Sequence, residues 1–167
     1  MRSALLALVL VAAPLSAQSP AEPVPAGLDS TLAALYARIS GPADVPRDAD
    51  AIRALFHEDA RLGPLRPDGT PALRTVDAYL DGLAETLRTV PLFQGKGFYE
   101  REIGRRVERF GPLAHVWSTY AGALEPGGDP FVRGVNSIQL VEADGRWVVV
   151  QILWQQESPE LILPKGS

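Results

Sequence analysis

The 167-residue chain contains no cysteine and only two histidines. The absence of cysteine excludes disulfides, thiolate nucleophiles and thiolate zinc sites. A site built from several histidines is not expected either, so we expect no metal and no cofactor. Acidic residues outnumber basic ones by 20 to 16, which disfavours nucleic acid and anionic membrane surfaces as partners. With 46% hydrophobic residues, the composition is that of one ordinary globular domain.

The opening apolar run, residues 4–13, is too short to cross a bilayer, which needs roughly 20 residues. It follows Arg2 and precedes Pro14, and the small residues Ser16 and Ala17 come next. This order is typical of a secretory signal peptide. We therefore expect residues 1–17 to be removed and the protein to be exported, to a periplasm or out of the cell. The proline-rich residues 18–27 are predicted to be a linker.

Apolar spacing from residue 28 onward predicts three helices. Leu28, Leu32, Leu35 and Ile39 recur at helical spacing, and Ser40 follows the last of them. A second helix is predicted from Asp48 or Asp50 through Phe56, followed by a short strand at residues 60–62. Thr75 is a suitable N-cap for a third helix, whose buried stripe is predicted to be Val76, Tyr79, Leu80, Leu83 and Leu87.

Beyond Gly97 the apolar period changes from 3.6 to 2. Four strands are predicted, at residues 98–110, 113–124, 131–142 and 147–156, and glycine or proline separates them. Short connections between successive strands favour an antiparallel meander. Helices followed by a meander predict an α+β domain over residues 28–158, with residues 159–167 as a C-terminal tail.

This order of elements resembles the nuclear transport factor 2-like superfamily, in particular its SnoaL-like branch. The segments that carry the resemblance are Leu35–Tyr36, Leu55–Ala60, Gly134–Leu140 and Gly145–Val150. The resemblance implies a cone-shaped, curved antiparallel sheet roofed by the three N-terminal helices, a pocket inside the cone, and dimers formed through the sheet. In steroid-isomerase-like members a tyrosine at the place of Tyr36 donates to the substrate oxygen. Their carboxylate base falls at Gly63–Pro64, where neither residue takes a proton, so that mechanism is not carried over.

Four residues are candidates for catalysis: His115, Tyr36, Tyr120 and His57. His57 stands with Glu58 and Asp59 at a predicted helix end, and it is either a general base oriented by a carboxylate or an exposed loop residue. His115 shares a strand face with Trp117. It is an acid–base candidate if that face looks into the cone, and a structural histidine of the sheet if it does not. The candidates for ligand binding are Trp117, Asn136, Gln151, Trp154 and Tyr79.

The first long strand is strongly charged. Counting by twos places Glu100, Glu102, Arg106 and Glu108 on one face, and Arg101, Ile103, Arg105, Val107 and Arg109 on the other. The arginines form either a row that recognises an anionic ligand or a solvated, ion-paired face. The last strand is apolar on both faces, with Trp147, Val149 and Leu153 on one and Val148, Val150, Ile152 and Trp154 on the other. A second subunit is expected to cover one of them, which predicts a homodimer through the sheet.

Together these features predict an exported domain that holds a small, mostly apolar molecule in its cone. One alternative is a cofactor-independent lyase, isomerase or cyclase-like enzyme that uses a pocket histidine with a tyrosine or carboxylate. Another is a structural dimer whose cone is filled by side chains. No nucleic acid or membrane partner is expected.

Overall fold

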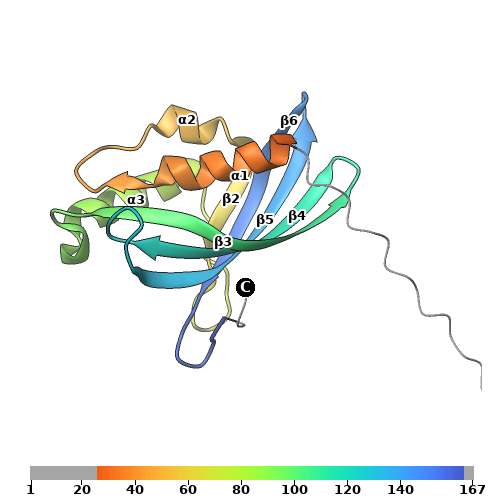
Figure 1. Ribbon diagram of the computed structural model, residues 1–167. Coiled ribbons are helices and arrows are strands. Elements are labelled where there is room, and N and C mark those ends of the chain that lie inside the picture. The colour runs from red at the N-terminus through yellow and green to blue at the C-terminus, as the bar shows by residue number, and fades with distance from the viewer. Residues whose placement is uncertain (1–25, 164–167) are drawn as a thin grey trace, which may run out of the picture.

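A single curved sheet carries the fold in the computed structural model, which describes residues 26–163. Its six strands lie in the order β1-β3-β4-β5-β6-β2. Within the described range their bounds are Gly41–Pro42 (β1), Phe56–Pro64 (β2), Gly97–Phe110 (β3), Leu113–Ala123 (β4), Pro130–Ala143 (β5) and Arg146–Gln156 (β6). The helices lie together on the concave side of the sheet (Figure 1). The predicted signal peptide lies outside the described residues, as does nearly all of the predicted linker.

The helices begin where side chains can satisfy their first backbone N–H groups. Helix α2 (Ala49–Arg53) is capped by Asp48, which accepts from the amide of Ala51, and helix α3 (Val76–Thr89) by Thr75, which accepts from that of Ala78. The predicted caps of both helices are therefore confirmed. Helix α1 (Ala26–Ile39) buries the predicted stripe, although it begins before the predicted domain boundary.

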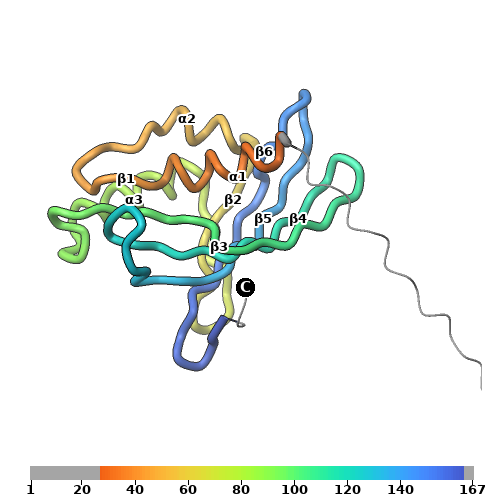
Figure 2. Tube along the Cα trace, viewed as in Figure 1, coloured from red at the N-terminus to blue at the C-terminus, as the bar shows by residue number. Residues whose placement is uncertain are grey.

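The four long strands form the predicted antiparallel meander, and the α+β cone is confirmed. The short strand predicted at residues 60–62 is wrong in length, because α2 ends at Arg53 and the chain extends as β2 from Phe56. Strand β2 pairs in parallel with β6, so the sheet is mixed rather than wholly antiparallel. These two strands, far apart in sequence, run side by side in Figure 2.

Two β-bulges change which side chains face the helices. One interrupts β3 between Glu102 and Gly104, and the other interrupts β6 at Val150. Each inserts one residue, and the alternation of faces shifts by one beyond it. Glu102 lies opposite the buried Tyr120, whereas Arg106 lies opposite the exposed Trp117. The prediction that Glu102 and Arg106 share a face is therefore wrong.

The bulge in β6 corrects the prediction for the last strand in the same way. Trp147, Val149 and Ile152 belong to one buried core, against which Trp154 packs. Val148 and Leu153 lie opposite Val141 and Ser137 on the outer face. Ile152 and Trp154 therefore face the helices together with Trp147, and not with Val148 as predicted. No helix within residues 26–163 is long and apolar enough to span a membrane.

Candidate functional site

A cavity of about 1140 Å³ lies between the concave face of the sheet and the helices. Two groups of aromatic side chains form part of its walls. Phe93, Phe98 and Phe131 meet edge to face with ring centroids 6.0–6.4 Å apart, and Tyr79 packs edge to face on Trp154 at 6.0 Å. Residues 65–67, Ser158 at the end of the predicted domain, and Glu160 and Leu161 of the predicted tail also line it.

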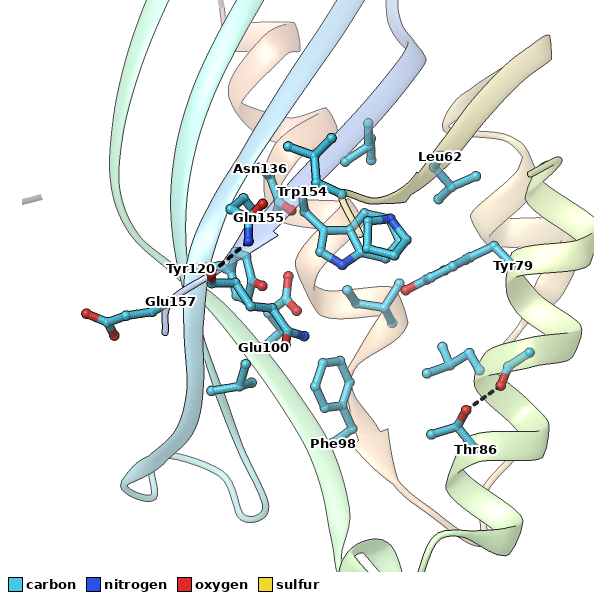
Figure 3. Close-up of a pocket in the computed structure, with 18 of the residues that line it drawn as sticks. Leu62, Tyr79, Thr86, Phe98, Glu100, Tyr120, Asn136, Trp154, Gln155 and Glu157 are labelled. Atoms are coloured by element: carbon cyan, nitrogen blue, oxygen red, sulfur yellow. Dashed lines mark hydrogen bonds between the residues drawn. The ribbon is translucent and has the colours of Figure 1, made fainter. Parts of the chain in front are cut away.

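Polar side chains also line the cavity, Arg74, Thr86 and Gln155 among them. Four others, Tyr36, Glu100, Tyr120 and Asn136, are called here the cavity floor. Glu100, Tyr120 and Asn136 come from three neighbouring strands, and Tyr79 faces them from α3 (Figure 3). Burial raises the pKa of the Glu100 carboxyl to about 7, while a hydrogen bond from Asn136 opposes the rise. Burial and the nearby Glu100 also raise the pKa of Tyr120 and of Tyr79. Glu100 is thus the floor group whose protonation changes near neutrality.

A chain of polar contacts leads from the floor to the edge of the sheet. The Tyr36 hydroxyl lies 3.1 Å from Nδ2 of Asn136 and 2.7 Å from Oγ of Ser118. Ser118 in turn donates to Oε1 of Glu102 at 2.5 Å. Arg105 then pairs with Glu102 at 2.9 Å and with Asp29 of α1 at 2.5 Å. We call this series, from Asp29 to Asn136, the relay.

Five of the nine candidates named from the sequence line the cavity. They are Tyr36 on α1, Tyr79 on α3, Tyr120 on β4, Asn136 on β5 and Trp154 on β6. Helix and strand spacing alone could not bring them together, because they come from five different elements. The tertiary fold makes one site of them.

The other four candidates lie outside the cavity. His115 and Trp117 are on the outer face of β4, where Nε2 of His115 lies 3.0 Å from Oγ of Ser137. Gln151 lies opposite Gln139 on the same outer face. His115 is therefore placed as a sheet histidine, and Trp117 and Gln151 are not cavity residues, because their strand positions alternate with those that point inward.

His57 is also placed differently from its prediction. It belongs to β2 rather than to a helix end, because α2 stops at Arg53. Its Nδ1 accepts from the amide of Asp59 at 3.1 Å. One ligand atom from each of His57, Glu58 and Asp59 lies within 4.8 Å of the others, but the two acidic residues are exposed and the group is outside the cavity.

Comparison with solved structures identifies the fold. A protein with a cystatin-like fold from Nostoc punctiforme PCC 73102 matches with a TM-score of 0.60 at 12% identity, over 80% of this chain and 90% of the other. An NTF-2 like protein from Silicibacter pomeroyi DSS-3 matches with a TM-score of 0.54 at 12% identity, over 79% of this chain and 94% of the other. The chain has a nuclear transport factor 2-like fold. The fold implied by the sequence resemblance is thereby confirmed.

A third match to this nuclear transport factor 2-like fold carries the provisional name scytalone dehydratase and comes from Novosphingobium aromaticivorans DSM 12444. Its TM-score is 0.55 at 16% identity, over 84% of this chain and 92% of the other. No family model matches the chain. No curated protein matches it in sequence. These likenesses establish the fold, and the chemistry of the cavity must be argued from its own residues.

Glu100 is the floor residue of this nuclear transport factor 2-like domain that the sequence analysis missed. It was grouped with Arg106 and Glu108 as part of a charged face, and the bulge that separates them has no obvious sequence signal. Two arginines of the predicted row form ion pairs instead. Arg105 pairs with Glu102 and Asp29, and Arg109 lies 3.3 Å from Glu142, with its guanidinium 5.1 Å from the Trp147 ring centroid.

Gly63, at the place of the steroid-isomerase base, has no room for a side chain. A Cβ atom there would come within 2.1 Å of the carbonyl oxygen of Ala72. Any residue other than glycine would force the segment after β2 to move. A carboxylate base at this position is therefore excluded on steric grounds as well.

Proposed function

We propose that this domain binds a small, mostly apolar molecule that carries one polar group. The observation that carries the proposal is the cavity itself, whose aromatic walls surround the polar floor. The apolar part of a ligand gains from leaving water, and the few polar groups fix its orientation. A cone filled by side chains, the structural alternative, does not fit a cavity of about 1140 Å³.

Native mass spectrometry of the protein purified from its own source tests this proposal. We expect an added mass that denaturation releases as a small molecule. Glu100→Gln and Tyr120→Phe alter the floor and should lower the retained fraction severalfold. Glu108→Gln is the matched control, because Glu108 lies on the same strand but opposite His115 on the outer face. Recovery of the bare chain from every preparation would contradict the proposal.

A second candidate function is acid–base catalysis of the lyase, isomerase or cyclase kind. It is favoured by the pKa of Glu100, about 7, and by Tyr120, its diagonal neighbour across β3 and β4. The histidine version of this hypothesis is set aside because His57 and His115 lie outside the cavity. Glu100 would instead take a proton from carbon next to a ligand carbonyl, and Tyr120 would donate to the resulting enolate oxygen.

The test for catalysis is exchange of solvent deuterium into an apolar ketone, 2-tetralone, followed by proton NMR. Catalysis predicts exchange faster than in buffer, loss of that acceleration in Glu100→Gln, and no change in Glu108→Gln. A deuterium-exchange rate with wild-type protein equal to that in buffer would contradict catalysis and leave ligand binding as the function.

We also infer a homodimer as the functional assembly. The outer face exposes 45% of Trp117, 48% of Leu113 and 87% of Phe110, which are large apolar side chains. A second copy of the chain that covers this face would remove them from water. Export remains a proposal based on residues 1–17 alone, and N-terminal sequencing of the exported protein should begin at Gln18.

A further inference from the structure

The direction of each hydrogen bond in the relay can be worked out from proton counts. The Ser118 hydroxyl has one proton, which it donates to the Glu102 carboxylate. In its hydrogen bond with Tyr36, Ser118 must then be the acceptor. Tyr36 therefore donates its own single proton to Ser118, away from the cavity.

This direction determines how Asn136 is oriented. Because the Tyr36 oxygen has no proton left, it can only accept, and the Asn136 amide must turn its Nδ2 toward it. The second N–H of the same nitrogen is then the donor to Glu100, the hydrogen bond that opposes the rise in the pKa of that carboxyl. Tyr36 is thus withdrawn from ligand recognition and serves to orient Asn136.

Glu100 and Tyr120 are the two floor groups that lie outside the relay. Tyr120 is only 3% exposed, and among the described residues its hydroxyl has no hydrogen-bond partner, although it lines the cavity. Glu100 has Asn136 as its one side-chain hydrogen-bond partner in the described part of the chain. Glu100 and Tyr120 are diagonal neighbours across β3 and β4, within reach of one ligand group (Figure 3).

We propose that the cavity floor recognises a hydroxyl group on a mostly apolar ligand. A hydroxyl donates one hydrogen bond and accepts others, so it can donate to the Glu100 carboxylate while it accepts from Tyr120. An ether can only accept, and an anionic group placed against the Glu100 carboxylate would meet a like charge. This inference rests on the proposed binding function and names the ligand class for the same cavity.

Glu102, which does not line the cavity, acts in this proposal as a positioning residue. Its carboxylate accepts from Ser118 at one oxygen and from Arg105 at the other. Because a carboxylate has no proton to give, Ser118 must be the donor in the hydrogen bond between them. An amide at this position could donate as well as accept, and the relay could then run either way. Asn136 would no longer be held with its N–H groups toward Glu100.

The ligand arm of the test uses 2-naphthylmethanol and its methyl ether, in which a methyl group replaces the donor proton. The added methyl group is the same at every pH, so the change in preference with pH isolates the effect of the proton. Calorimetric titration at pH 8, where Glu100 is mostly ionised, should show the alcohol binding about tenfold more tightly than the ether. At pH 5.5 the protonated carboxyl can donate to either oxygen, so the preference should fall below about threefold. Tyr120→Phe should weaken both probes, and Glu108→Gln should weaken neither.

The positioning arm needs no ligand. Carboxyl-carbon NMR on glutamate-labelled protein should show the Glu100 titration move upward by about half a pKa unit or more in Glu102→Gln. Ser118→Ala, which breaks the relay at a different residue, should move it in the same direction. Glu108→Gln should leave it in place, and thermal melts establish that each variant is folded. A general loss of packing would change the melts without this selective change in titration.

The outcomes separate the claims. Equal binding of alcohol and ether at pH 8 would overturn hydroxyl recognition while the binding function stands. Binding of neither probe would overturn both. An unchanged Glu100 titration in Glu102→Gln and Ser118→Ala would overturn the role of Glu102, whatever the probes do.

Discussion

The hydroxyl of Tyr36 lies 2.7 Å from Oγ of Ser118, and this contact joins the first helix to the middle of the sheet. The two residues are 82 positions apart in sequence, and both are buried. Each hydroxyl has another polar partner, Asn136 for Tyr36 and Glu102 for Ser118. The contact therefore serves both the stability of the fold and the geometry of the cavity floor.

A double-mutant cycle should measure this contact directly. Tyr36→Phe and Ser118→Ala each leave a buried group without a partner, so each should lower the free energy of unfolding by about 1–3 kcal/mol. The double variant should lose less than the sum, by about 1 kcal/mol, because the second change removes a group already unpaired. Urea unfolding of the four proteins gives the coupling. Strict additivity would mean that the two hydroxyls do not interact.

The titration of Glu100 should appear in the pH dependence of stability. Its pKa is about 7 in the folded protein and 4.5 in an unfolded chain, so the folded state holds the proton more tightly between these values. Its contribution to the free energy of unfolding therefore falls by roughly 3 kcal/mol as the pH rises from 4.5 to 7, and is constant above that. Glu100→Gln should remove this decline, and Glu108→Gln should keep it. Urea unfolding at pH 4.5, 6 and 8 measures the free energy of unfolding of each protein. If wild type and Glu100→Gln lost the same free energy between pH 4.5 and 8, the prediction would be contradicted.

Trp154 should contribute to stability through its packing on Tyr79 and the core. Trp154→Ala is expected to lower the free energy of unfolding by about 3 kcal/mol, at the low end for a core tryptophan, because Trp154 is partly buried and one side borders the cavity. Trp154→Phe keeps a ring against Tyr79 and should cost less than half as much. Equal losses in the two variants, measured by urea unfolding, would show that the ring contact is not what matters.

The homodimer proposal predicts twice the chain mass in light scattering of the wild type at micromolar concentration. Trp117→Arg places a charge in the middle of the exposed outer face and should give a monomer of unchanged secondary structure. Trp154→Phe changes the cavity side of the sheet instead and should remain dimeric. A wild type that scatters as a monomer would remove the proposal.

Much of the secondary structure could be predicted because its signals are local. The stripe from Leu28 to Ile39, the caps at Asp48 and Thr75, and the glycine turns between the long strands each act within a few residues. The same local counting placed His115 and Trp117 together on one face of β4, which the structure retains. It could not tell which face looks inward, because that depends on where the helices pack.

The cavity floor was predicted only in part for a related reason. Tyr36, Tyr120 and Asn136 were named as single candidates, but only packing between elements far apart in the chain brings them into one cavity. The hydrogen bond between Tyr36 and Asn136 is one such contact. Glu100 was misassigned because the bulge after Glu102 separates it from Arg106, and period-2 counting assumes an unbroken ladder.

The amino-acid sequence by itself determined the class of fold, the order of its elements and the apolar stripes of its helices, because periodicity and turn chemistry are written along the chain. Only the tertiary structure decided which charges are inside and which histidines are outside. It also decided that the Glu100 carboxyl shares the cavity with Tyr120, whose hydroxyl has no hydrogen-bond partner within residues 26–163. Those outcomes depend on strand register and on the packing of helices against one face, and both are set by contacts between residues far apart in the chain.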